Sequence, residues 1–179
     1  DEPEETEKSP AGLLPGPAKG EVTFEHVSFS YGDTPVIRDF NVTVKSGQMV
    51  AIVGPTGAGK TTLINLLLRF YDVNGGRILV DGVDIRDMNR EDLRSMFGMV
   101  LQDTWLFSGT IFDNIRYGNL SARKDEVIDA AKMANVHHFI RTLPQGYNMV
   151  INEEGSNISQ GEKQLLTIAR AILKNPQIM

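Results

Sequence analysis

The segment GPTGAGKT, residues 54–61, constrains this chain more than any other part of its sequence. It fits the pattern G-x-x-x-x-G-K-[ST] at every fixed position. Glycines allow consecutive backbone N–H groups to turn inward around phosphate groups, and Lys60 adds a positive charge for the outer phosphates. An apolar run, residues 50–53, precedes the segment, and KTTLINLLLRF follows it with helical spacing. We therefore predict a strand, a phosphate-binding loop and a helix, in that order.

This loop predicts a site for a nucleoside triphosphate. The positive N-terminal end of the following helix favours bound phosphate, and the Thr61 hydroxyl offers a ligand for Mg²⁺. The predicted nucleotide-binding residues of the loop are Gly54, Pro55, Thr56, Gly57, Ala58, Gly59, Lys60 and Thr61. A dinucleotide-binding loop is less favoured, because the glycines do not follow the spacing G-x-G-x-x-G.

Composition excludes several other classes of protein. The 179 residues are 41% hydrophobic, which is enough for the core of one globular domain. A net charge of −5 argues against a nucleic-acid partner, and the lack of cysteine excludes disulfides and thiol catalysis. The adjacent histidines His137 and His138 cannot share one helix face, so we interpret them as structural or facing solvent rather than as metal ligands.

The order of sequence patterns predicts an α/β fold with a helical insert. Residues 1–20 hold four of the eight prolines and five acidic residues, as is typical of a flexible linker. The alternation in EVTFEHVSFSY slips by one place, which predicts a strand with a bulge. Further strands are expected at NVTV, QMVAIVG and FGMVLQ, with a hairpin turn at Asp81 and Gly82. Residues 121–143 are predicted to be helical and to end before Pro144.

A second boundary between polar and apolar residues occurs in GSNISQGEKQLLTIARAIL, residues 155–173. The apolar spacing predicts a largely buried helix, and Ser159 and Glu162 fit a capping box. The same helix end is chemically suited to bind phosphate through its hydroxyl and its exposed N–H groups. The two roles are compatible, because the capping box uses only some of the terminal donors.

Residues 21–179 resemble the nucleotide-binding domain of an ABC transporter of the exporter type. Besides residues 54–62, which extend the loop match to Thr62, Tyr31 in FSYGDTPVI sits where the family has an aromatic residue that stacks on adenine. Gln102 in VLQDTWLF matches the Q-loop glutamine, which in the family reaches Mg²⁺ and the attacking water. The resemblance therefore implies ATP and Mg²⁺ as cofactors, Lys60 and Gln102 as catalytic residues, and Thr61 and Gln102 as metal ligands.

The sequence ISQGE, residues 158–162, resembles the family signature Leu-Ser-Gly-Gly-Gln, and Glu153 resembles the acidic residue that precedes it in exporters. The resemblance implies that Ser159, Gln160 and Gly161 contact the γ-phosphate held by a second nucleotide-binding domain. Gln160 and Glu162 depart from the family residues, and Glu162 adds a negative charge near that phosphate unless the capping box turns it away.

The resemblance implies a P-loop NTPase (RecA-like) core with an N-terminal antiparallel β-subdomain and a helical insert, in which the C-terminal part of the domain is missing. The expected parts are a linker from an upstream membrane domain at 1–20, the core at 21–103, the Q-loop and helical subdomain at 104–162, and the signature helix at 163–179. Its partners would be a second nucleotide-binding domain and a transmembrane domain, at the cytoplasmic face of the cell membrane.

The resemblance implies an ATPase that powers export, with two alternatives left open: a non-catalytic nucleotide-binding or dimerisation module, and a soluble ATPase of the same superfamily. The family's Walker B aspartate, catalytic glutamate and switch histidine follow the point where this sequence stops, so the 179 residues alone are expected to be inactive. Two structural alternatives also remain. Tyr31 could be a core residue at the end of a strand, and Trp105, Leu106 and Phe107 could belong to the core or to the groove that receives the membrane domain.

Overall fold

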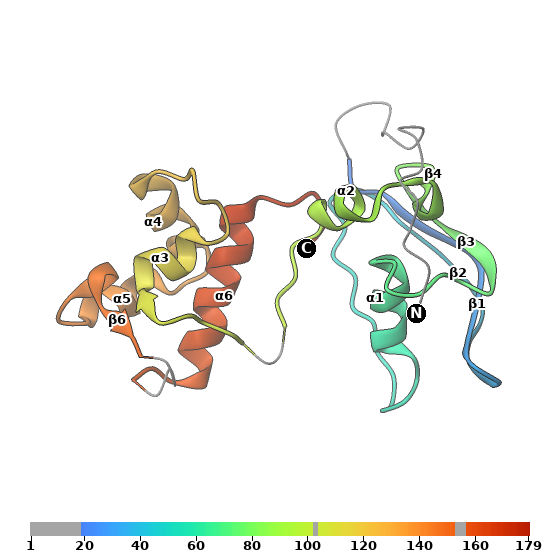
Figure 1. The fold of residues 1–179 in the computed structure, drawn as a ribbon, viewed down its shortest axis with the longest axis horizontal. Coiled ribbons are helices and arrows are strands. Elements are labelled where there is room, and N and C mark those ends of the chain that lie inside the picture. Colours follow the sequence, from blue (N-terminus) through green and yellow to red (C-terminus); the bar gives the residue numbers. More distant parts are fainter. Residues whose placement is uncertain (1–18, 102–103, 153–156) are drawn as a thin grey trace, which may run out of the picture. The chain divides into compact units, whose positions relative to one another are not determined.

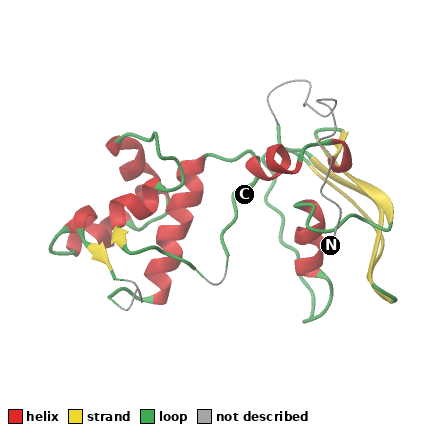
Figure 2. Cartoon of the chain, in the orientation of Figure 1, coloured by secondary structure: helices red, strands yellow, loops and turns green. Residues whose placement is uncertain are grey.

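The computed structural model describes residues 19–101, 104–152 and 157–179 (Figure 1). The chain divides into two compact units, Asp1–Met96 and Phe97–Met179. We call them the sheet unit and the helical unit, because the long strands belong to the first and most of the helices to the second (Figure 2). In the ranges that the structure describes, no helix is both long and apolar enough to cross a membrane.

The sheet unit contains the predicted antiparallel sheet, with strand order β2-β1-β3-β4 (Figure 1). The strands are β1 (Val22–Tyr31), β2 (Thr34–Val44), β3 (Gly75–Val80) and β4 (Val83–Asp84). NVTV lies in β2, as expected. The predicted two-residue hairpin turn joins β3 to β4, where Val80 pairs with Val83. Asp81 and Gly82 have φ values of 50° and 80°, the left-handed conformations that such a turn requires.

The predicted bulge in the first strand is present. The register of β1 against β2 shifts between Phe24 and Val27, and His26 has φ 51°. The shift lets Phe24 and Val27 both face the core although they are three positions apart. Gly76 of β3 lies so close to the backbone carbonyl of Glu25 that no larger residue would fit there without movement.

Two predicted strands do not form. Residues 49–53 of QMVAIVG are irregular, and Met49 and Val53 are 100% and 86% exposed. No strand among the described residues pairs with this run, and a strand of a buried parallel sheet needs such neighbours. FGMVLQ was predicted as a buried strand, but its described residues, 97–101, make only one bridge, from Phe97 to Ile178. Apolar composition indicated these strands, but it did not show whether their partners are present.

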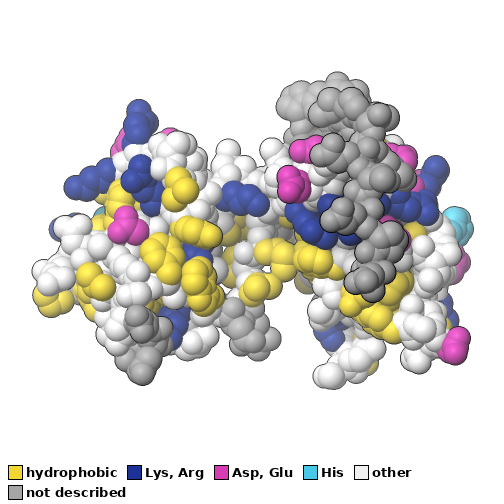
Figure 3. All heavy atoms as spheres, viewed as in Figure 1, with side chains coloured by type: hydrophobic (Ala, Val, Ile, Leu, Met, Phe, Trp, Pro, Cys, Tyr) yellow, Lys and Arg dark blue, Asp and Glu magenta, His cyan; other side chains and the backbone are white. Residues whose placement is uncertain are grey.

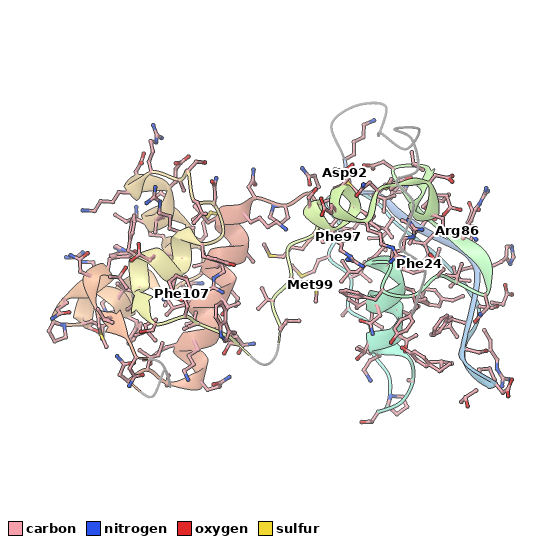
Figure 4. All side chains as sticks on the ribbon, in the orientation of Figure 1. Phe24, Arg86, Asp92, Phe97, Met99 and Phe107 are labelled. Carbon is pink, nitrogen blue, oxygen red and sulfur yellow. The ribbon has the colours of Figure 1, made fainter. Side chains whose placement is uncertain are left out.

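Among the described residues of the sheet unit there are also three helices: α1 (Lys60–Leu67), η1 (Ile85–Asp87) and α2 (Arg90–Ser95). The helix predicted after the glycine-rich loop is therefore confirmed as α1. The α2 helix was not predicted, although Asn89 accepts a hydrogen bond from the Glu91 N–H as its N-cap. Phe24 of β1 and Arg86 of η1 are labelled in Figure 4 within this unit.

The helical unit packs α6 (Gln160–Lys174) against α3 (Ile111–Arg116) and α4 (Lys124–Met133). It also holds α5 (His137–Thr142), η2 (Gly146–Asn148) and the pair β5 (Gly109–Thr110) and β6 (Val150–Ile151). Residues 121–143 were predicted to be helical. They form α4 and α5, which are separated at Asn135 with φ 58°. The fully buried residues of this core include Ile111, Ile115, Val127, Ile140 and Leu166.

Candidate functional site

The glycine-rich loop turns through left-handed conformations that favour glycine. Gly57 and Gly59 have φ values of 84° and 87°, and the Ala58 N–H donates to the Pro55 carbonyl at 3.2 Å. Gly59 is also the N-cap of α1, and no side chain caps that helix end. The first N–H groups of α1 are therefore not occupied by a capping side chain, and this arrangement is suited to an anionic ligand.

Lys60 extends back across the loop rather than into solvent. Its Nζ donates hydrogen bonds to the carbonyl oxygens of Gly54 and Pro55, both at 2.8 Å. The ammonium group thus lies beside the backbone that the glycines expose. A phosphate oxygen that approaches this loop would meet a positive charge whose present partners are neutral carbonyls.

The loop lies against β2 close to the end of β1. A Cβ on Gly59 would be 2.7 Å from Ile37 Cδ1 and 3.1 Å from Val36 Cγ1, so only glycine fits without movement. Ile37 pairs with Phe29 and Thr34 pairs with Tyr31 across the β1–β2 ladder. Tyr31 is two residues beyond Phe29, so it lies about 7 Å further along β1 than the residue that pairs with Ile37.

Tyr31 is the last residue of β1 and is 40% exposed, so it is not enclosed in the core. Its ring meets those of Phe29 and Tyr71 edge to face, with centroids 4.9 and 5.3 Å apart. The Thr61 side chain is exposed on the first turn of α1, whereas Thr62 is buried. The sheet unit therefore places one exposed aromatic ring, that of Tyr31, and two exposed threonines, Thr56 and Thr61, among the predicted site residues.

The helix end at α6 has the predicted capping box. Ser159 Oγ accepts from the Glu162 N–H at 3.3 Å, and Glu162 Oε2 accepts from the Ser159 N–H at 2.7 Å. The Glu162 carboxylate is therefore turned back toward the start of the helix. Gln160 Nε2 donates to Thr104 Oγ1 at 3.2 Å. A Cβ on Gly161 would meet no atom of the described residues within 4 Å, so these residues leave open space at this position.

Two predicted site residues, Gln102 and Glu153, lie outside the described residues. The other predicted residues fall on both units: Tyr31 and residues 54–62 on the sheet unit, and Ser159, Gln160 and Gly161 on the helical unit. Among the described residues, no group of three or more His, Cys, Asp or Glu side chains is arranged to hold a metal ion.

Sequence reasoning missed a polar centre in the helical unit. Asn114 is fully buried, and its side chain bonds both the N–H and the carbonyl of Phe107, at 3.1 and 3.0 Å. Arg170 of α6 donates to the Asn114 carbonyl at 2.9 Å and to the Trp105 carbonyl at 3.1 Å. Burial lowers the pKa of Arg170, and Tyr117 partly opposes that shift. No sequence motif marks these residues, because each is a common polar residue in a helical pattern.

This polar centre holds the segment that follows residues 102 and 103 against α6. The segment's aromatic residues are only partly in the core: Trp105 is 61% exposed and contacts Phe107 with centroids 6.1 Å apart. Hydrophobic side chains lie at the surface of the helical unit among charged ones (Figure 3). The exposure of Trp105 argues against the core interpretation for this residue, and its place in a groove for the membrane domain stays a prediction.

Comparison with known proteins identifies the class. The family model described as "ABC transporter" matches residues 37–179. The chain is 56% identical over 180 residues to a fatty acid ABC transporter ATP-binding/permease protein of Mycobacterium bovis, covering 100% of this chain and 28% of that protein. It is 50% identical over 158 residues to an ATP-dependent lipid A-core flippase of Syntrophus aciditrophicus, covering 88% of this chain and 26% of the flippase.

A solved structure agrees with these relatives. A bacterial Atm1-family ABC exporter with ATP bound matches with a TM-score of 0.85 and 45% sequence identity, over 94% of this chain and 30% of the exporter. The chain belongs to the ABC transporter family and is a nucleotide-binding domain of the exporter type. The predicted fold class is confirmed. The chain spans less than a third of the length of these relatives.

Proposed function

We propose that this chain binds Mg²⁺-ATP and, in an intact exporter, uses ATP binding and hydrolysis to power transport across a membrane. The observation that carries the proposal is the loop at residues 54–61. It leads into an α1 helix whose N-terminus has no side-chain cap, and Lys60 Nζ lies 2.8 Å from two loop carbonyls. Gly57 and Gly59 take φ values of 84° and 87°, left-handed conformations that let the loop turn its backbone N–H groups toward a phosphate.

Each group of site residues binds a different part of the nucleotide. Backbone N–H groups of the loop and α1 bind the phosphates, and Lys60 exchanges its carbonyl partners for phosphate oxygens. Thr61 supplies a hydroxyl ligand to Mg²⁺, which neutralises charge on the outer phosphates. Tyr31 offers its exposed ring to adenine. Gln102, by resemblance, contacts the metal and the attacking water.

The proposed partner is a second nucleotide-binding domain, identical or related. Ser159, Gln160 and Gly161 would contact the γ-phosphate held by that domain. Support comes from the open space at Gly161 and from the Glu162 carboxylate, which the Ser159 N–H holds back at 2.7 Å. The capping box thus removes the obstacle that a glutamate at this position would present to phosphate.

A transmembrane domain is the second proposed partner, which would place this chain at the cytoplasmic face of a membrane. The names of relatives as ATP-binding/permease proteins support this proposal. We also infer that the 179 residues alone hydrolyse ATP negligibly, because by resemblance the water-polarising glutamate and a metal-binding aspartate belong to a later segment.

The Lys60→Ala variant of the intact protein tests this function. We expect its affinity for Mg²⁺-ATP, measured by titration calorimetry, to fall by at least about tenfold, because a charge-assisted contact to phosphate is lost. Lys124→Ala removes an exposed lysine from the helical unit and is the matched control. Equal affinity in Lys60→Ala and Lys124→Ala would contradict the proposal. Tight ATP binding without phosphate release by the intact protein would favour the non-catalytic module.

A further inference from the structure

Three aromatic rings form a cluster at the end of β1. Phe29, Tyr31 and Tyr71 contact one another pairwise, with centroids 4.9 Å (Phe29–Tyr31), 5.3 Å (Tyr31–Tyr71) and 5.7 Å (Phe29–Tyr71) apart. Phe29 and Tyr31 are two positions apart on one strand, so they share a face. Phe29 is 5% exposed, whereas Tyr31 and Tyr71 are 40% and 46% exposed. The cluster therefore has a buried base and two exposed tyrosines.

The geometry within the cluster fixes the plane of the Tyr31 ring. The interplanar angles of Tyr31 to Phe29 and to Tyr71 are 88° and 89°. Edge-to-face contacts of this kind are favourable, because the positive edge of one ring meets the negative face of another. Tyr31 is held from two sides, one of them by a residue far away in sequence. Tyr71 supplies that second side.

The segment that carries Tyr71 is itself held firmly on the side of α1. Arg69 is buried, and it donates to Asp72 Oδ1 and to the Met88 carbonyl, both at 3.0 Å. Arg94 donates to the Leu68 carbonyl at 3.1 Å. These bonds fix the chain immediately before and after Tyr71.

A second set of bonds ties this segment to β1 itself. Asn74 Oδ1 accepts from the Ser30 N–H at 2.7 Å, and the Asn74 N–H donates to the Ser28 carbonyl at 3.0 Å. Ser30 lies between Phe29 and Tyr31. Hydrogen bonds therefore join the strand end that carries Tyr31 to the segment that carries Tyr71.

We propose that Tyr71 is a positioning residue for the nucleotide base: it holds the Tyr31 ring in the orientation that stacks on adenine. This inference rests on the adenine-binding role of Tyr31 under Proposed function. Tyr71 follows the end of α1, the helix that begins at the phosphate-binding loop. The Tyr31 ring, which would contact the base, is therefore oriented by a residue that directly follows the helix starting at the phosphate site. No ring contact of the cluster involves a residue of the phosphate-binding loop.

The test compares a ligand that has a base with one that lacks it. In the intact protein, calorimetry measures the affinities for Mg²⁺-ATP and for Mg²⁺-tripolyphosphate in Tyr71→Ala, Tyr71→Leu and Tyr71→Phe. We expect Tyr71→Ala and Tyr71→Leu to weaken ATP binding roughly fivefold and to leave tripolyphosphate binding unchanged. Tyr71→Phe keeps the ring, so we expect it to bind ATP with the affinity of the unsubstituted protein. Tyr71→Leu removes the ring but keeps apolar volume, so it tests the role of the ring even if Tyr71→Ala does not fold.

A double variant separates this inference from the function it rests on. If Tyr71 acts through Tyr31, Tyr71→Ala has no further effect on ATP affinity in the Tyr31→Ala background. Weaker ATP binding in Tyr31→Ala, without weaker binding in Tyr71→Ala or Tyr71→Leu, would overturn this inference alone. Equal losses for ATP and tripolyphosphate would also overturn it, since they indicate a general structural role. Unchanged ATP affinity in Tyr31→Ala would overturn the adenine role itself.

Discussion

Ser159 and Glu162 bond each other reciprocally at the start of α6, with Ser159 Oγ accepting from the Glu162 N–H at 3.3 Å and Glu162 Oε2 accepting from the Ser159 N–H at 2.7 Å. The pair satisfies two of the donors that a helix start leaves unpaired. It also keeps a carboxylate away from the open space at Gly161. One local motif thus stabilises the helix and keeps its end accessible to an anion.

Glu162→Gln removes the negative charge at residue 162 and keeps its capping hydrogen bond. Glutamine can accept the same bond from the Ser159 N–H, so we expect the free energy of unfolding to fall by no more than about 0.5 kcal/mol. Glu162→Ala removes the acceptor and should cost about 1 kcal/mol. Urea denaturation of the two variants measures the difference. Equal losses in both would show that the reciprocal bond contributes no stability.

Ser159→Ala distinguishes a helix cap from a phosphate ligand. The loss of the cap costs about 1 kcal/mol of stability. If Ser159 also contacts phosphate, ATPase activity of the intact protein should fall much further than this loss of stability explains, because a charge-assisted bond is removed. Phosphate release is measured at a temperature where both proteins remain folded. Near-normal activity there would restrict Ser159 to capping.

Asp81 anchors residues 19–21, which directly precede β1. Its carboxylate accepts from three consecutive N–H groups, those of Lys19, Gly20 and Glu21, at 2.8, 3.2 and 2.9 Å. Asparagine suits the same left-handed turn position, so Asp81→Asn isolates the carboxylate. We expect amide hydrogen exchange at residues 19–21 to speed up by about tenfold. Unchanged exchange there would mean that these bonds do not hold residues 19–21.

The Asp84–Arg86 pair predicts a dependence of stability on acid. Burial raises the pKa of Asp84, but hydrogen bonds and charge from Arg86 outweigh it, so the pKa is lowered from 3.8. A lowered carboxyl pKa contributes stability that is present above pH 3.8 and is lost as pH falls through the lower value. Asp84→Asn should therefore reduce stability at pH 7 by about 1 kcal/mol or less, because Arg86 is partly exposed. In urea denaturation that deficit should shrink below pH 4; a deficit equal at pH 7 and pH 3 contradicts it.

Local signals predicted those parts of the fold that depend on neighbouring residues. Three such features were predicted correctly, because each one follows from residues a few positions apart. They are the turn at Asp81 and Gly82, the slip in alternation before Val27 and the cap at Ser159. Residues 49–53 show the limit of such signals. Their apolar run predicts a strand, but whether it forms depends on distant partners that composition does not reveal.

The candidate site also contains residues that the sequence predicts and residues that only the structure shows. The loop at residues 54–61 was predicted from its motif alone, since phosphate chemistry dictates both residue types and spacing. Tyr71 and Asn114 could not be predicted, because an aromatic residue after a helix and an asparagine within one are common in any domain. Only the packing shows that Tyr71 meets Tyr31 at 5.3 Å and that Asn114 is buried.

The measurement that most directly tests the account is ATP-driven association of nucleotide-binding domains in Gly161→Asp. Gly161 has open space around it, so Gly161→Ala is a matched control that should fold and associate normally. Aspartate at this position would repel the γ-phosphate of the partner's ATP. We predict that Gly161→Asp binds ATP with nearly unchanged affinity in calorimetry and fails to associate with ATP in sedimentation. If Gly161→Asp associates with ATP and hydrolyses it as Gly161→Ala does, the start of α6 is only a helix cap.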